Sequence, residues 1–154
     1  MGKKIIATAG FTLIELLVVI SIIGILAAMV TVSFTSSQRQ AKDTQRKSDL
    51  TQYRTSLESY AGKSNGLYVV DTSPAAVSTG SSFCTAISSS GSCPEDPKSP
   101  TTTYKYCSDS LGANYALWAS LENTASTYWV VCSDGRSGTS LSQPSCGGSF
   151  NCLP

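Results

Sequence analysis

The first quarter of the chain is almost entirely apolar. Residues 11–34 contain no proline and a single charged residue, Glu15. As a helix this stretch would extend about 36 Å, which is enough to cross the hydrocarbon core of a bilayer. A carboxylate inside that layer costs about 2.5–3.5 kcal/mol, so Glu15 is expected to serve a function that needs a cationic partner. The pattern predicts a membrane-embedded helix over residues 11–34.

Beyond this stretch the sequence becomes polar but keeps a helical pattern. Glycine and proline are absent from residues 35–61, and the first helix breaker is Gly62. We expect an amphipathic helix over residues 35–61 with Gly62 as a left-handed cap. Its apolar side chains recur at helical spacing and form one stripe that can cover a sheet: Leu50, Tyr53, Leu57 and Tyr60.

Residues 62–154 are predicted to form the head. Residues 71–103 are rich in Ser, Thr, Pro and Gly, and are interpreted as a surface connection with a short helical turn near residues 83–87. Aromatic and β-branched residues then predict three strands: Tyr104–Ser108, Asn114–Leu121 and Tyr128–Ser133. Hairpin-sized breaks indicate an antiparallel meander, with the helical stripe as its cover and both faces of the middle strand at least partly covered. The expected class is α+β.

Charge and composition limit the functions of the chain. The 154 residues carry 11 basic and 10 acidic side chains and no histidine. Without Lys3 and Lys4, nine basic residues remain against 10 acidic ones, which gives a net charge of −1 from Phe11 onward. This excludes a strongly basic nucleic-acid binder. No Cys-x-x-C, phosphate-binding glycine loop or convincing acid pair is present, so neither an enzyme nor a cofactor is expected.

All six cysteines follow residue 80. An even number behind a membrane segment indicates disulfides in an oxidising, extracytoplasmic compartment. Short separations favour Cys84–Cys93 and Cys146–Cys152 as local pairs, which leaves Cys107–Cys132 to join the sheet. Six cysteines allow fifteen connectivities. The third pair is the least well supported, because the first and last strands of a meander flank the middle one, which can place their Cα atoms beyond the limit of about 7 Å.

The residues before the apolar stretch suggest processing. Lys3 and Lys4 favour a cytoplasmic N-terminus. The apolar stretch is too long for an ordinary signal peptide, whose core has about 7–15 residues. A simple single-pass anchor is the second interpretation. Gly10 lies directly before Phe11, and Glu15 lies four residues after Phe11. These two features favour a more specific interpretation than a simple anchor.

The run Gly10-Phe11-Thr12-Leu13-Ile14-Glu15 resembles the N-terminal motif of type IV pilins and type II secretion pseudopilins. The resemblance implies that residues 1–10 are a leader, that prepilin peptidase cuts between Gly10 and Phe11, and that Phe11 is N-methylated. It also implies the pilin fold. Cleavage would make Phe11 an α-ammonium, which Glu15 could neutralise within one helical turn or on the next subunit.

The resemblance further implies a structural subunit of a type IV pilus-like filament. Such a filament is a homo-oligomer. Each subunit starts in the cytoplasmic membrane, with its N-terminus in the cytoplasm. A membrane assembly platform then moves it into an extracellular or periplasmic filament. One alternative is a pseudopilin of a type II secretion or DNA-uptake machine. Another is a monomeric membrane-anchored binding domain, which would tolerate loss of Glu15.

Two further features carry expectations. Residues 133–138 resemble the end of the major secretion pseudopilin, where the segment binds calcium, but Asp134 is the last acidic residue of the chain. A calcium ion needs six to eight oxygen ligands, so Asp134 is a weak candidate. The basic cluster Arg39, Lys42, Arg46 and Lys47 is interpreted as a solvated helix surface that pairs with neighbouring subunits. Binding to DNA or lipid headgroups is the alternative for this cluster.

Overall fold

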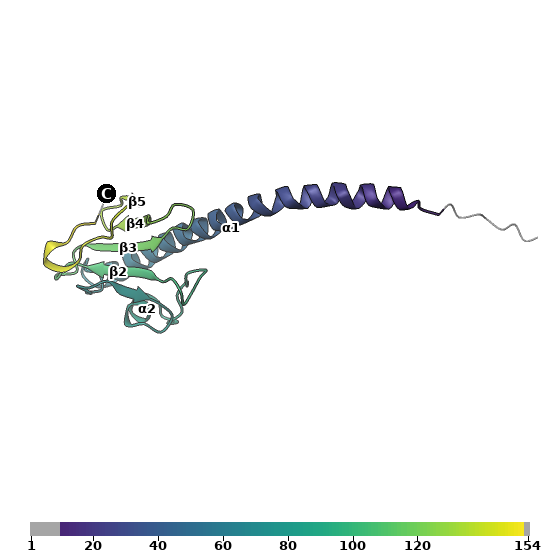
Figure 1. Cartoon of the computed structure of the whole chain (residues 1–154). Coiled ribbons are helices and arrows are strands. Elements are labelled where there is room, and N and C mark those ends of the chain that lie inside the picture. Colours follow the sequence, from purple (N-terminus) through teal and green to yellow (C-terminus); the bar gives the residue numbers. More distant parts are fainter. Residues whose placement is uncertain (1–9, 153–154) are drawn as a thin grey trace, which may run out of the picture. The chain divides into compact units, whose positions relative to one another are not determined.

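The computed structural model describes residues 10–152, apart from the side chains of residues 30–33 (Figure 1). Most of the expected leader, residues 1–9, lies outside the described residues. Helix α1 (Leu13–Lys63) is followed by a sheet with a second, short helix α2 (Ser82–Ile87). Contacts divide the chain into two compact units, one ending at Gln38 and the other beginning at Arg39.

Helix α1 does not end as expected. Gly62 lies inside its last turn, so the prediction of a left-handed cap at Gly62 is wrong. The left-handed residues are Asn65 (φ 56°) and Gly66 (φ 82°), and the N–H of Gly66 donates to the carbonyl of Ala61 at 2.8 Å. This six-to-one bond is that of a Schellman motif, in which asparagine tolerates the positive φ almost as well as glycine.

The sheet has five strands in the order β1-β2-β3-β4-β5, and every neighbouring pair is antiparallel. The three predicted strands are confirmed as β2 (Tyr104–Ser108), β3 (Tyr115–Ser120) and β4 (Tyr128–Cys132). The prediction of a three-stranded sheet is wrong, because β1 (Ala75–Val77) and β5 (Ser137–Ser140) add one strand at each edge. Both edge strands are short and lack a pattern of bulky alternating residues.

One face of the sheet is covered by the C-terminal part of α1 (Figure 1). Leu50, Tyr53 and Leu57 are buried there, as the stripe predicted, whereas Tyr60 is only half-buried. The aromatic rings of Tyr53 and Tyr104 meet edge to face at 5.9 Å between centroids. The sheet contributes most of the other buried side chains of this core: Tyr104, Tyr106, Tyr115, Leu117, Ala119 and Val131.

The opposite face of the sheet holds a second core. Side chains alternate along β3, so Ala116 and Trp118 point away from α1. Both are at most 1% exposed, because the C-terminal tail packs over them with Cys152 and Phe150. The middle strand is therefore buried on both faces, as its composition predicted.

The tail is held on this second face by disulfides. Cys107 pairs with Cys146 and Cys132 pairs with Cys152, so the predicted pairs Cys107–Cys132 and Cys146–Cys152 are wrong. The strand register gives the reason: Cys107 and Cys132 lie opposite Ala116 on its two sides. Two strand spacings separate them by roughly 10 Å, beyond the reach of a disulfide. Each bonds instead to a cysteine of the tail above.

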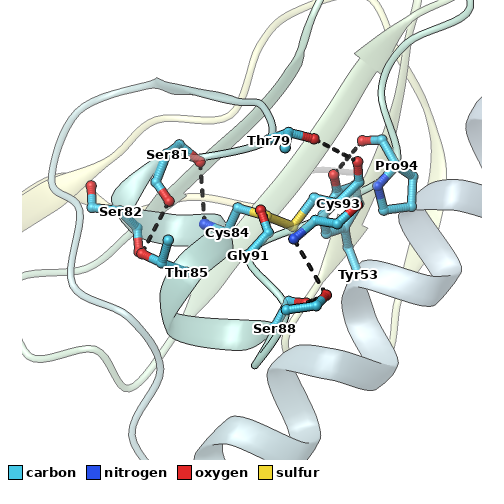
Figure 2. Close-up of a disulfide and its surroundings, with 12 residues drawn as sticks. Tyr53, Thr79, Ser81, Ser82, Cys84, Thr85, Ser88, Gly91, Cys93 and Pro94 are labelled. Atoms are coloured by element: carbon cyan, nitrogen blue, oxygen red, sulfur yellow. Dashed lines mark hydrogen bonds between the residues drawn. A yellow bond between two sulfur atoms is a disulfide. The ribbon is translucent and has the colours of Figure 1, made fainter.

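The third disulfide, Cys84–Cys93, is confirmed. Figure 2 shows it joining α2 to the returning chain, next to Tyr53 of α1. The helical turn expected near residues 83–87 is confirmed as α2, whose first turn is capped by the Ser81 hydroxyl accepting the N–H of Cys84 at 3.2 Å. The Tyr53 hydroxyl donates to the carbonyl of Pro94, which ties this loop to α1.

We expect the three disulfides to differ in their contribution to stability. Removal of Cys107–Cys146, which closes 39 residues, should lower the free energy of unfolding by about 4 kcal/mol, and removal of Cys84–Cys93, which closes 9, by about 2.6 kcal/mol. The measurement is denaturant unfolding of C107S/C146S and C84S/C93S, followed by tryptophan fluorescence. An equal or reversed order would contradict the dependence of the stabilisation on the length of the closed loop.

Candidate processing and assembly site

The candidate processing segment is the stretch from Gly10 to Glu15. Gly10 and Phe11 precede α1, which begins at Leu13, and the Phe11 side chain is 82% exposed. A Cβ added to Gly10 would meet nothing within 4 Å. The bond between Gly10 and Phe11 is therefore not enclosed by any other described part of the chain.

Thr12 and Glu15 form a reciprocal cap at the start of α1. One Glu15 carboxylate oxygen accepts the Thr12 backbone N–H at 2.9 Å and the Thr12 hydroxyl at 2.7 Å. In return, the Glu15 N–H donates to the Thr12 hydroxyl oxygen at 3.3 Å. This is a capping box, and it gives partners to N–H groups that helical bonds leave free. Such partners are needed most where water is scarce.

The role of Thr12 was missed in the sequence, although its signal was present there. Thr-x-x-Glu before an apolar run is the signature of a capping box. In the uncut chain the Phe11 nitrogen is an uncharged amide, so the cationic partner expected for Glu15 does not exist before cleavage. The carboxylate is nevertheless already held next to the residue that would carry the new α-ammonium.

The apolar half of α1 presents bare hydrophobic side chains. Among the described residues, α1 is the one helix long and apolar enough to cross a membrane. The described side chains of this half are mostly exposed, and an apolar surface of this size is unfavourable in water. It has the length and composition of a membrane anchor. At least half of each of these side chains is exposed: Phe11, Leu13, Ile14, Leu16, Leu17, Ile20, Ile22, Ile23, Ile25, Leu26, Met29 and Phe34.

The head is fastened to α1 by an ion cluster around Arg46, whose side chain is fully buried. Its guanidinium binds both oxygens of Asp96, through Nε at 2.8 Å and Nη2 at 3.0 Å. Nη1 donates to Asp43 at 2.8 Å, and Nη2 also donates to Glu122 at 2.7 Å. A planar guanidinium suits this bidentate arrangement better than an ammonium.

The carboxylates of the cluster also hold the loops of the head. Asp43 accepts the backbone N–H groups of Glu122 and Asn123, each at 2.9 Å. Asp96 accepts the hydroxyl of Thr102 at 2.6 Å. Among the described residues, no buried side-chain nitrogen or oxygen lacks a hydrogen-bond partner. The cluster therefore joins α1, the loop after Cys93 and the β3–β4 loop.

The expectation that Arg46 lies on a solvated helix surface is wrong. Its partners Asp96 and Glu122 lie 50 and 76 residues away in sequence, so no local pattern could show the burial. Arg39 is exposed as expected. Lys47 is half-buried, with its Nζ 4.5 Å from the centroid of the Trp129 ring.

The cluster shifts the pKa values of its members. Burial alone would raise the pKa of Asp96, but hydrogen bonds from Arg46, Thr102 and the Lys98 N–H outweigh it and hold the pKa below its usual value. Burial would also raise the pKa of Glu122. Hydrogen bonds from Lys98 and Arg46 outweigh this effect and lower the pKa. The pKa of Arg46 is raised by the carboxylates, although desolvation acts against this.

The weak calcium candidate, Asp134, is engaged by its neighbour. Its carboxylate accepts the backbone N–H of Arg136 at 3.0 Å and the Arg136 Nε at 2.7 Å. Both hydrogen bonds lower the pKa of Asp134, and the backbone hydrogen bond has the larger effect. Within residues 10–152, no group of three or more His, Cys, Asp or Glu side chains is arranged to hold a metal ion. A cation at Asp134 would have to compete with the Arg136 guanidinium.

These features define a class of protein: a long helix with a processing segment, an apolar anchor and a disulfide-bonded α+β head, as in the pilin fold. Comparison with family models identifies residues 7–31 as the prokaryotic N-terminal methylation motif. This is the prepilin motif found in type IV pilins and pseudopilins, and the chain carries it directly before and within the apolar part of α1. Neither a curated protein nor a solved structure matches the chain.

Replacement of Arg46 by methionine should lower the free energy of unfolding by about 3–5 kcal/mol, because it leaves the buried carboxylates of Asp43 and Asp96 without their cation. The matched control is Lys98→Met, since Lys98 pairs with Glu122 at 3.0 Å but its side chain is 45% exposed. Such a partly exposed pair contributes about 1 kcal/mol at most. Denaturant unfolding of both variants measures the difference, and similar losses would contradict a buried cluster.

Stability should fall in acid. The lowered pKa of Asp96 means that its contribution is complete above its unfolded-state pKa, about 3.9, and is lost as the pH falls through the lower folded-state value. The unfolding midpoint, measured at a series of pH values from 7 to 2.5, should decrease once the pH is below about 4. Asp96→Asn should make this part of the curve flatter. An unchanged slope in Asp96→Asn would assign the acid sensitivity to other groups.

Proposed function

We propose that this protein is the structural subunit of a type IV pilus-like filament, processed by prepilin peptidase after Gly10 and polymerised through its N-terminal helix. The observation that carries the proposal is the methylation motif at residues 7–31, which leads directly into an exposed apolar helix. A helix of this kind needs lipid or other apolar helices around it. The filament supplies those helices from further copies of the chain.

Processing and assembly are linked through charge. Removal of residues 1–10 takes away Lys3 and Lys4. The apolar segment can then leave the membrane without moving two ammonium groups through hydrocarbon, each of which costs several kcal/mol. Cleavage also creates the Phe11 α-ammonium, so one new charge takes the place of the two that were lost.

Glu15 is the proposed partner of that new charge. In the uncut chain its carboxylate already accepts the Thr12 N–H, one residue from the Phe11 nitrogen. An α-ammonium left unpaired in apolar surroundings costs about 3–5 kcal/mol. An incoming subunit avoids this cost when its Phe11 docks against the Glu15 of a subunit already in the filament. Assembly is then favoured over remaining in the bilayer.

The same motif occurs in pseudopilins, which makes a subunit of a secretion or DNA-uptake machine the second candidate. It shares the processing and the docking of the N-terminal helix with the first. In both cases the role is structural, and the buried Asp43, Arg46 and Asp96 are used in holding the head to α1. Loss of surface filaments on deletion supports the pilus, and loss of a secreted protein or of DNA uptake supports the pseudopilus.

We expect Glu15→Gln to abolish or sharply reduce filaments while leaving the subunit at normal abundance in the membrane. Glutamine keeps an acceptor for the Thr12 N–H but has no charge, so the helix cap survives and the pairing with an α-ammonium does not. Glu15→Val removes both and should fail at least as severely. Subunit abundance in membranes and filament yield are measured together for each variant.

The comparison of the two variants separates the roles of Glu15. If Glu15 acts only as a helix cap, Glu15→Gln assembles normally and Glu15→Val lowers the amount of inserted subunit. Thr12→Ser, which keeps the hydroxyl, is the matched control and should assemble normally. Normal filaments from Glu15→Gln at normal subunit abundance would contradict the proposed assembly role of the Glu15 charge.

A further inference from the structure

Burial sorts the charged residues at the beginning of the head. Residues 39–49 of α1 carry four bases and two acids, Asp43 and Asp49. In the structure the two acids face the head: Asp43 is 6% exposed and binds Arg46, and Asp49 is 7% exposed. Asp49 accepts the hydroxyl of Tyr104 at 2.6 Å. Neither carboxylate forms an ion pair with Arg39 or Lys42.

The bases nearest the apolar segment remain without such partners. Arg39 is exposed and Lys42 is partly exposed. No ion pair joins either residue to any part of the chain within residues 10–152. Lys47 differs, because its ammonium lies over the ring of Trp129. Arg39 and Lys42 are therefore two cations available to a partner outside the chain.

Their place in the sequence limits what that partner is. Arg39 follows Phe34, the last residue of the apolar stretch, by five residues. Five residues extend about 7.5 Å as a helix and at most about 18 Å in any conformation. The headgroup layer on each side of a bilayer is about 5–7 Å thick. Side chains on a helix also lean toward its N-terminus, which here is the direction of the apolar stretch.

We propose that Arg39 and Lys42 bind the phosphate groups of anionic phospholipids at the membrane surface. This rests on the proposed function, because it requires the apolar half of α1 to lie in a bilayer before assembly. The Arg39 guanidinium offers a fork of donors that matches a phosphate, and Lys42 adds a second positive charge one turn later. The contacts fix the depth of the unassembled subunit and are broken when it enters the filament.

Charge favours lipid over nucleic acid as the partner. From Phe11 onward the chain has nine basic and 10 acidic residues, because Lys3 and Lys4 are two of the 11 bases. Affinity for DNA grows with the number of phosphates that a protein neutralises. Two cations on a chain of net charge −1 neutralise few. A membrane surface is different, since the apolar segment alone keeps these cations beside it.

Lipid selectivity of the full-length chain tests the proposal. The protein is reconstituted into phosphatidylcholine vesicles that contain traces of spin-labelled phosphatidylglycerol or phosphatidylcholine, and the immobilised fraction of each label gives their relative association. R39Q/K42Q should lower the preference for phosphatidylglycerol about five-fold or more at low salt. The matched control Lys47→Gln should leave it unchanged. Lys3 and Lys4 are the same in all three proteins, so their effect cancels.

Each outcome decides the proposal. An unchanged preference in R39Q/K42Q, or an equal loss in Lys47→Gln, overturns it. Weaker binding of R39Q/K42Q to a short fluorescent DNA duplex, with its lipid preference intact, also overturns it and assigns the cations to nucleic acid. Flotation of the wild-type chain with vesicles after a carbonate wash separates the proposed function from the proposed lipid binding. If the chain does not float with the vesicles, both proposals fail. If it floats but shows no preference for phosphatidylglycerol, only the proposed lipid binding fails. Unchanged unfolding midpoints confirm that the variants are folded.

Discussion

The head is organised by the need to bury its middle strand on both faces. Tyr115, Leu117 and Ala119 require one apolar cover and Ala116 and Trp118 require another, because side chains alternate along β3. Helix α1 supplies the first cover. No second helix of comparable length follows it, so the second cover is an irregular tail, which needs covalent attachment to stay in place. The disulfides of Cys107 and Cys132 to that tail follow from this constraint.

The Arg46 cluster solves a related problem at the end of the head nearest residue 39. The loops that carry Asp96 and Glu122 have little apolar surface, and the cluster adds side-chain contacts that hold them against α1. A buried guanidinium is costly to desolvate, so it is tolerated only where every donor has a partner. That requirement makes the cluster specific: the loops have one arrangement that satisfies Arg46. The apolar half of α1 differs from the head, because its described large side chains are mostly exposed.

Sequence patterns predicted what depends on neighbouring residues. The helical stripe, the strands β2, β3 and β4, the α2 turn and Cys84–Cys93 all follow from spacing over a few residues. Features set by distant contacts could not be predicted in this way. β5 is polar and pairs only because β4 has a free edge, and Arg46 is buried by loops 50 and 76 residues away. At the candidate site, Gly10, Phe11 and Glu15 were found from the motif, whereas the capping role of Thr12 required the geometry.

In the proposed function, this chain becomes a filament subunit only after residues 1–10 are removed. Mass spectrometry of the N-terminal peptide, from subunits isolated from membranes and from filaments of the same cells, tests it most directly. We expect filament subunits to begin at Phe11 with a methylated α-amino group. Chains that begin at Met1 should be found only in the membrane. Filament subunits that still carry Met1 and the residues up to Gly10 would contradict it.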